Sequence, residues 1–172
     1  MIVSKTEYVK SEEIKGVIVK KSRLIPDERG RLMEILRNDE IFFKKFGQVY
    51  VMTTYPGVVK GFHWHKEQID NVCCLSGMIK LVLFDIREDS ETNHNLLELF
   101  IGAHNPCLVV IPNNVLHGWK CISEHEALIM NVPTEVFNYS NPDEQRVSPH
   151  DEQKQIEKLG FAIPYSWDRV DK

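Results

Sequence analysis

The stretch that decides the fold is Val58-Val-Lys-Gly-Phe-His-Trp-His-Lys-Glu-Gln-Ile-Asp-Asn-Val-Cys-Cys-Leu-Ser-Gly77. Its residues alternate as in one strand, a turn and a second strand. Successive side chains of a strand point to opposite faces, so His63 and His65 share one face and Trp64 lies on the other. Two imidazoles on a rigid strand favour a ligand or metal site over a core. Asp70, just past the turn, can face the same pair.

The bulk composition is that of an ordinary globular chain. With 172 residues, 42% of them hydrophobic and 27% charged, we expect one domain over residues 1–172. The net charge of −4 argues against nucleic-acid binding. No apolar run has membrane-spanning length and the N-terminus lacks a signal-peptide pattern, so we expect a cytoplasmic protein with no membrane partner. The cysteines lack CxxC spacing and are predicted to be reduced, buried thiols.

Short strands predominate along the rest of the chain. Runs rich in β-formers predict strands at residues 15–21, 48–54, 78–86, 96–101, 107–111 and 126–132. Gly, Pro and Asn punctuate the segments between them, and Leu24–Glu34 is predicted to be such a turn. Many short strands at close spacing are typical of an all-β sandwich or barrel.

Two short helices are predicted at the edges of this β pattern. The first covers Asn38–Phe46, where Ile41, Phe42 and Phe46 recur at helical spacing and Asn38 or Asp39 can cap the helix. The second lies within Ser148–Leu159, with Ile156 and Leu159 as its apolar contacts. The segment Ile163–Trp167 is then expected to dock as a tail.

Several motifs follow one another in a fixed order. They are Asp27-Glu-Arg-Gly30 with Glu34, Val59-Lys-Gly-Phe-His63, Ile111-Pro with His117-Gly118, Asn141-Pro-Asp-Glu144, and Ile163-Pro-Tyr-Ser-Trp167. In order and spacing, over roughly residues 16–168, they resemble the dTDP-4-dehydrorhamnose 3,5-epimerase family. The resemblance implies a double-stranded β-helix, or cupin jelly roll. It also implies an epimerase or isomerase that acts on a nucleotide-diphosphate 4-keto-6-deoxyhexose in polysaccharide biosynthesis.

The resemblance assigns roles to individual residues. His63 stands where the family has its general base. Arg29 and Glu34 stand where the family contacts the nucleotide, with Arg29 reaching a diphosphate from the swapped N-terminal strands, about residues 1–47, of a partner subunit in a homodimer. Lys60 stands where an arginine usually meets phosphate, and keeps the charge without the bidentate fork.

Further pocket residues follow from the same resemblance and from their neighbours. His117 matches the second pocket histidine, and Tyr139 falls near the pocket tyrosines that return a proton. Asp70 aligns with the catalytic lysine, and we expect it to act by accepting an N–H from His63 or His65. His65 is an additional substrate contact, and Trp119 is a candidate to stack on the sugar or base.

The expected chemistry is proton transfer without a cofactor. A proton on a carbon next to a ketone is acidified by the carbonyl, and histidine suits the base role because its ordinary pKa is about 6.5. Three alternatives stay open. The chain could be a sugar 3,4-ketoisomerase, since Gly61–Lys66 also resembles that group, or a non-catalytic nucleotide-sugar binder. It could also be a metal-dependent cupin that holds one divalent transition metal through His63, His65, Asp70 and His117.

Overall fold

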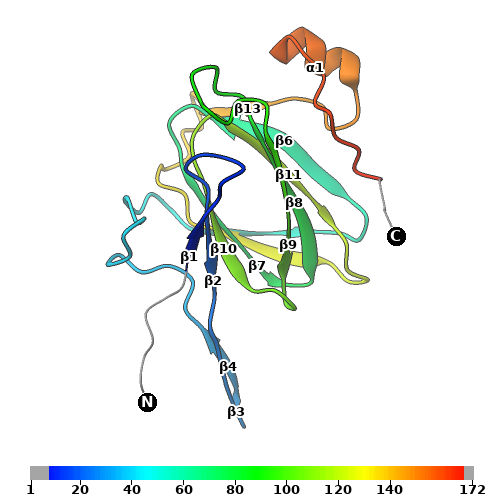
Figure 1. Ribbon diagram of the computed structural model, residues 1–172. Helices are drawn as coiled ribbons and strands as arrows, with labels where there is room; N and C mark the ends of the chain where they lie inside the picture. Colours follow the sequence, from blue (N-terminus) through cyan, green and yellow to red (C-terminus); the bar gives the residue numbers. More distant parts are fainter. Residues whose placement is uncertain (1–7, 169–172) are drawn as a thin grey trace.

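Two antiparallel β-sheets packed face to face form the body of the protein (Figure 1). The computed structural model describes residues 8–168. In spatial order, the six-stranded sheet contains β1 (Tyr8–Lys10), β2 (Ile18–Lys21), β10 (Cys107–Ile111), β7 (Asp70–Ser76), β12 (Ala127–Asn131) and β5 (Tyr50–Thr54). The five-stranded sheet contains β13 (Glu144–Arg146), β6 (Val59–His65), β11 (Val115–Cys121), β8 (Met78–Asp85) and β9 (Leu96–Gly102). The predicted all-β jelly roll is confirmed.

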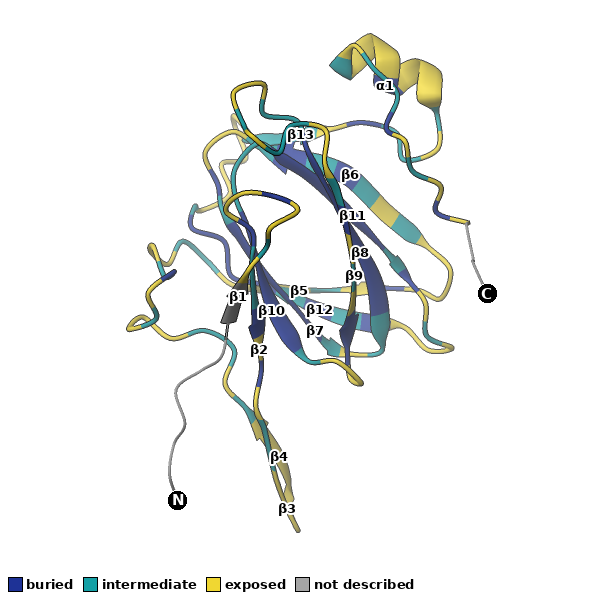
Figure 2. Ribbon diagram, viewed as in Figure 1, coloured by how far each residue is buried: buried dark blue, intermediate teal, exposed yellow. Residues whose placement is uncertain are grey.

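Two elements lie outside these sheets. A hairpin of β3 (Leu24–Asp27) and β4 (Gly30–Met33) projects from the body, and helix α1 (Glu152–Leu159) lies beyond the opposite end (Figure 1). Both are largely exposed, whereas the central strands of the sheets are largely buried (Figure 2). The segment Leu24–Glu34, predicted to be only a turn, thus contains two paired strands, with Gly30 opposite Asp27.

Strand β8 is buried on both faces, which explains its nearly continuous apolar sequence. Ile79, Leu81 and Leu83 point into the core between the sheets, together with side chains of β7 and β10. The alternate residues Val82 and Phe84 belong to a second core on the outer face, under the C-terminal tail. The tail docks there as predicted, since Ile163 and Trp167 are both buried. All four cysteines are buried free thiols, as predicted.

The helix predicted at Asn38–Phe46 is wrong. This segment forms turns over residues 38–42 and then runs without helix or strand to residue 49. Its apolar residues do not share one buried face: Phe42 packs against β7 and β10, while Ile41 is 79% and Phe46 62% exposed. Glu40 instead forms a buried ion pair with Lys20, which holds the segment to β2 as a loop.

Helix α1 is confirmed, but one of its predicted contacts is not. Ile156 is exposed, whereas Leu159 packs at the edge of the outer core. Gln155 takes the buried position because both ends of its amide are used: Nε2 donates to the Ser148 carbonyl at 2.9 Å and Oε1 accepts from the Ile163 N–H at 2.8 Å. The helix is therefore attached to the tail by hydrogen bonds as well as by apolar packing.

Strands β6 and β11 approach each other unusually closely at a pair of glycines. A Cβ built on Gly61 would lie 2.7 Å from Gly118 Cα, and a Cβ on Gly118 would lie 2.9 Å from Gly61 Cα. Only glycine fits at either position without a backbone shift. The close approach brings His63 directly opposite His117 in the register of the two strands.

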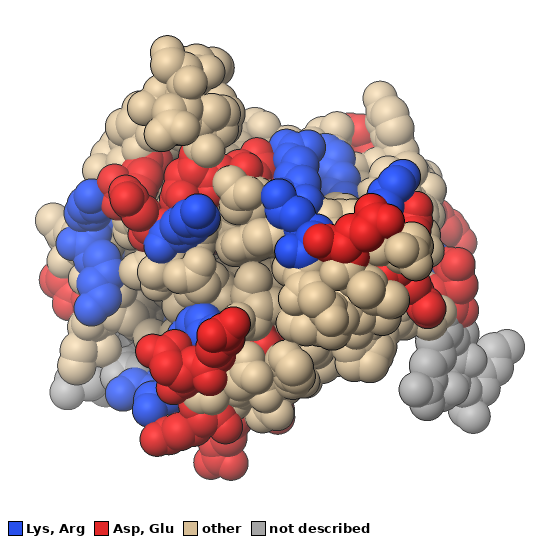
Figure 3. All heavy atoms as spheres, turned by 90° about the horizontal axis from the view of Figure 1, so that it is seen from above, with Lys and Arg blue, Asp and Glu red and all other residues tan. Residues whose placement is uncertain are grey.

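The surface carries both signs of charge. Basic and acidic side chains are interspersed over the face seen in Figure 3, in keeping with a net charge of −4 over the whole sequence. Among residues 8–168, no helix has both the length and the apolar character that a membrane span requires.

The loop between β8 and β9 is organised by one buried carboxylate. Both oxygens of Asp85 pair with the Arg87 guanidinium at 2.8 Å, and Oδ2 also accepts from the Ser90 and Thr92 hydroxyls. Burial raises the pKa of Asp85, but these partners outweigh it and lower the pKa from 3.8 to about 2. The folded state therefore gains stability from this group above pH 3.8 and loses it as the pH falls toward 2.

We expect Asp85→Asn to lower the free energy of unfolding at pH 7 by about 2 kcal/mol, the equivalent of the pKa shift. The difference from the unmodified protein should shrink as the pH falls from about 4 to about 2, because the carboxyl then becomes neutral in both states. Urea unfolding at a series of pH values measures this. Asp89→Asn, an exposed carboxylate of the same loop, is the matched control. An equal effect of both substitutions would contradict the assignment.

Candidate active site

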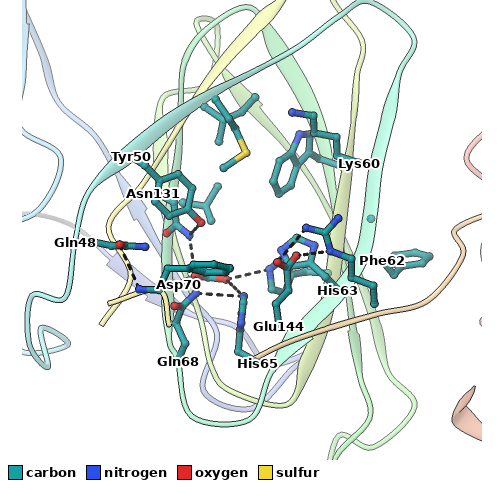
Figure 4. A pocket seen from close by; sticks show the side chains of 18 of the residues that line it. Gln48, Tyr50, Lys60, Phe62, His63, His65, Gln68, Asp70, Asn131 and Glu144 are labelled. Atoms are coloured by element: carbon teal, nitrogen blue, oxygen red, sulfur yellow. Dashed lines mark hydrogen bonds and ion pairs between the residues drawn. The ribbon is translucent and has the colours of Figure 1, made fainter. Parts of the chain in front are cut away.

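A cavity of about 800 Å³ lies between the two sheets. Its walls come from β5, β7 and β12 of the six-stranded sheet and from β6, β11 and β13 of the five-stranded sheet (Figure 4). The volume is within the range of small-molecule sites in proteins. The stretch Val58–Gly77 therefore supplies part of the wall of a large pocket.

Three histidines meet on one wall of this cavity. His63 and His65 lie two residues apart on β6 and share its inner face, and His117 on β11 pairs with His63 across the strands. The ring centroids of His63 and His117 are 4.1 Å apart, and His65 lies 5.7 Å from His63 and 6.1 Å from His117. The alternation of a strand thus brings together the imidazoles as predicted.

Asp70, the first residue of β7, faces this group from the other sheet. Its Oδ2 lies 3.1 Å from His117 Nε2 and 3.4 Å from His65 Nε2. Its Oδ1 accepts from Gln68 Nε2 at 2.8 Å and from Asn131 Nδ2 at 2.7 Å. The prediction that Asp70 faces the histidine pair is confirmed for His65, while its second partner is His117.

The turn between β6 and β7 is held by a residue far along the chain. The carboxylate of Asp143 accepts the backbone N–H groups of Lys66, Glu67 and Gln68, each at 3.0 Å. These bonds fix the turn immediately after His65 and place Gln68 beside Asp70. The pKa of Asp143 is lowered, since these hydrogen bonds outweigh the opposing effect of burial.

Burial and charge set different protonation states within the cluster. Burial, followed by the neighbouring His117, lowers the pKa of His63 well below 6.5, so this imidazole is neutral near pH 7. Burial raises the pKa of Asp70, but the imidazoles of His117 and His65 outweigh it and the carboxylate stays ionised. Burial lowers the pKa of His65, but contact with Asp70 outweighs it, and the net shift is upward.

The other predicted pocket residues from the body of the protein also line the cavity. Lys60 on β6 donates from Nζ to the Thr53 carbonyl at 2.7 Å. Trp119 on β11 donates from Nε1 to Thr54 Oγ1 at 2.9 Å, and its ring lies 5.9 Å from that of His63. Tyr139 lies on the loop before β13, is 90% exposed, and packs edge-on against Phe137.

Arg29 and Glu34 do not line the cavity of their own chain. Arg29 lies in the tip of the β3–β4 hairpin, where its guanidinium bonds Asp27, and Glu34 forms an ion pair with Arg37. Both are exposed on the projecting hairpin. Their predicted contact with substrate requires a second copy of the chain and stays a prediction.

Several cavity residues were missed from the sequence. They are Gln48, Tyr50, Gln68, Asn131, Phe137, Glu144 and Arg146. Two of them could have been identified from the sequence. Gln48 and Tyr50 are two residues apart in the strand predicted at residues 48–54, so they were expected to share one face. No local signal identifies Arg146, which lies opposite His63 in the pairing of β13 with β6.

Comparison with known proteins places this site in a family. The model of the family described as dTDP-4-dehydrorhamnose 3,5-epimerase matches residues 11–168. The spore coat polysaccharide biosynthesis protein SpsL of Bacillus subtilis strain 168 is 39% identical over 139 residues, 81% of this chain and 92% of that protein. The probable low-salt glycan biosynthesis epimerase Agl13 of Haloferax volcanii is 39% identical over 140 residues, 80% of this chain and 89% of that protein.

A solved structure supports the same assignment. The dTDP sugar isomerase of Desulfovibrio desulfuricans G20 is 28% identical and superimposes with a TM-score of 0.80, covering 92% of this chain and 95% of that one. The motifs from which the resemblance was inferred thus lie within the matched range and in a matching fold. The chain belongs to the dTDP-4-dehydrorhamnose 3,5-epimerase family, and it is an enzyme of the isomerase class.

Proposed function

We propose that this protein epimerises a nucleotide-diphosphate 4-keto-6-deoxyhexose, with His63 as the base. The observation that carries the proposal is the position of His63, a neutral and partly buried imidazole on the wall of a cavity of about 800 Å³. A neutral ring nitrogen can accept a proton, and the cavity has room for a sugar next to it.

The proposed reaction consists of two proton transfers. His63 forms an N–H bond with the proton on the carbon next to the ketone, the C–H electron pair becomes the C=C bond of an enolate, and the carbonyl electrons move onto oxygen. A proton returned to the opposite face of that carbon restores the ketone and inverts the centre. Tyr139, whose phenolic O–H can donate a proton, is the proposed donor. Neither step oxidises or reduces the sugar, so no redox cofactor is needed.

The nucleotide end of the substrate is assigned to the polar rim of the cavity. Among the described residues that line it, Lys60 and Arg146 are the only lysine and arginine. They lie on adjacent strands, β6 and β13, and a diphosphate needs such a pair of cations. The aromatic rings of Trp119 and Phe137 offer stacking surfaces for the base.

The names of the relatives narrow the class of substrate. The family is described by a dTDP-linked sugar, and the relative from Desulfovibrio is called a dTDP sugar isomerase. SpsL and Agl13 are named for polysaccharide and glycan biosynthesis. We therefore propose a dTDP-4-keto-6-deoxyhexose as substrate and a surface glycan as the eventual destination of the sugar.

The proposal extends to a homodimer that exchanges its N-terminal strands. The β3–β4 hairpin projects from the body and leaves Leu32 57% exposed (Figure 1). Strand β5 is the edge of the six-stranded sheet, with Val49 beside it 53% and Val51 on it 59% exposed. An open apolar edge and a projecting hairpin are both features that pairing of two copies would cover.

His63→Asn is expected to reduce kcat by about 10²- to 10⁴-fold, the usual contribution of a general base, with little change in KM. The measurement is incorporation of solvent deuterium at C3 and C5 of dTDP-4-keto-6-deoxyglucose. His104→Asn removes an exposed histidine outside the cavity and serves as the control. Deuterium incorporation at the unmodified rate in His63→Asn would remove this residue from the base role.

Lys60→Ala and Arg146→Ala are each expected to raise KM about 10-fold while changing kcat less, because a phosphate contact binds ground state and transition state alike. Lys44→Ala, an exposed lysine outside the cavity, is the control. The inhibition constant of dTDP should rise in parallel with KM. If dTDP binds both variants as tightly as the unmodified protein, the diphosphate does not lie at this rim.

Arg29→Ala tests the exchanged dimer. We expect the protein to elute as a dimer in size-exclusion chromatography and the variant to show a KM raised about 10-fold, since a hairpin from the partner would supply a charge-assisted phosphate contact. Arg23→Ala, which changes an exposed arginine just before the hairpin, is the matched control. A monomeric protein in which Arg29→Ala leaves KM unchanged would refute the exchange.

A further inference from the structure

The four polar side chains at the centre of the cavity have the spacing of a metal site. One ligand atom from each of His63, His65, Asp70 and His117 lies within 4.8 Å of all the others. Asp70 Oδ2 lies 3.1 Å from His117 Nε2 and 3.4 Å from His65 Nε2. Ligand atoms about 2.1 Å from a metal stand ~3.0 Å apart in an octahedral site and ~3.4 Å apart in a tetrahedral one.

His117 supplies a second observation that points to a ligand. Its Nδ1 lies 2.9 Å from the Val115 carbonyl, which can only accept, so Nδ1 carries the hydrogen. In the neutral ring Nε2 then bears a lone pair. This nitrogen belongs to a side chain that is 2% exposed, and it makes no hydrogen bond with any of residues 8–168. Asp70 Oδ2 lies 3.1 Å away, but a neutral ring whose hydrogen is on Nδ1 has none to donate from Nε2 to this oxygen.

A buried and unpartnered imidazole nitrogen calls for an explanation, because nearly all buried polar atoms are satisfied. A metal ion would satisfy Nε2 through its lone pair. Metal-binding histidines usually donate their other ring N–H to a carbonyl or carboxylate, which fixes the tautomer. The bond from His117 Nδ1 to the Val115 carbonyl provides that arrangement.

The carboxylate of Asp70 is oriented in the same way. Gln68 and Asn131 both donate to Oδ1, at 2.8 and 2.7 Å, and the Asn131 amide is itself held by a 2.9 Å bond to the Tyr50 hydroxyl. These contacts satisfy one oxygen and leave Oδ2 directed at His65 (Figure 4) and at His117. A fixed carboxylate with one free oxygen is a suitable monodentate ligand.

Charge also favours a cation at this point. The proposed reaction develops negative charge on the ketone oxygen, and an enolate formed beside Asp70 would be repelled by its carboxylate. A divalent ion bound to Asp70 changes the charge of that unit from −1 to +1. The ion would then polarise the ketone oxygen as a Lewis acid.

We propose that His65, Asp70 and His117 bind one divalent transition-metal ion, with His63 left free beside it as the base. Two histidines and one carboxylate leave coordination positions open for a substrate oxygen. Only the catalytic role of the ion rests on the proposed function, since binding can be measured without any sugar.

Binding is tested with Co²⁺ on the 172-residue chain, purified without a histidine tag and dialysed against a chelator. We expect about one equivalent of Co²⁺ per chain by elemental analysis after equilibrium dialysis, with visible absorption bands from nitrogen and oxygen ligation. His65→Gln, Asp70→Asn and His117→Gln should lose both signals, whereas His104→Gln should keep them. Asn131→Ala should weaken binding about 10- to 100-fold while retaining the ligands.

Circular dichroism melting of each variant without metal shows whether it is folded, and only folded variants are compared. The site is overturned if the unmodified protein does not bind Co²⁺, or if His117→Gln binds Co²⁺ with undiminished absorption bands. His63→Asn is expected to retain about one equivalent. If it loses the ion as the ligand variants do, His63 is a fourth ligand and the three-ligand site with a free base is wrong.

Deuterium incorporation distinguishes this inference from the proposed function. We expect the chelated protein to lose turnover about 10²-fold or more and to regain it on addition of Co²⁺, Mn²⁺ or Zn²⁺. Full turnover by the metal-free protein would overturn the catalytic role of the ion while leaving the epimerase proposal intact. Stoichiometric metal binding with no turnover of any dTDP-4-keto-hexose would support the metal site and refute the proposed function.

Discussion

The close contact between β6 and β11 is the constraint on which the site depends. Gly61 and Gly118 meet with no room for a Cβ on either strand, and the same pairing sets His63 opposite His117. The rings of these two histidines are 4.1 Å apart. The two glycines therefore help to position the histidines on the same two strands, although they take no part in the reaction themselves.

A buried carboxylate is the second requirement of this arrangement. Asp70 is 1% exposed and ionised, which would be very costly without partners. The two amides at Oδ1 compensate for part of the lost hydration, and the contact of His65 with Oδ2 for another part. A residue that is expensive to bury and is held from both sides by partners of matching chemistry is better explained by function than by stability.

The fold and the centre of the site could be predicted from the sequence because their signals are local. The period of two along Val59–His65 identifies the strand and the shared face of its histidines, and the turn that follows brings Asp70 to the same place. The failures involve long-range contacts. The helix at Asn38–Phe46 is replaced by a loop held through Lys20, and Arg146 reaches the cavity only because β13 pairs with β6. The sequence names the four candidate metal ligands, but the buried Nε2 of His117 without a hydrogen-bond partner is visible only in three dimensions.

The packing on the outer face of β6 constrains the evolution of the protein. Phe62 and Trp64 alternate with the histidines and point away from them, into the core beneath the C-terminal tail, where Phe62 lies 5.1 Å from the ring of Trp167. The tail thus packs against the outer face of β6, the strand that carries His63 and His65. Substitutions in the tail are therefore expected to affect the position of the imidazoles, because the two sets of side chains share one strand. We therefore expect substrate specificity to change more readily by substitutions in the exposed loop that carries Phe137 and Tyr139 than by substitutions in β6.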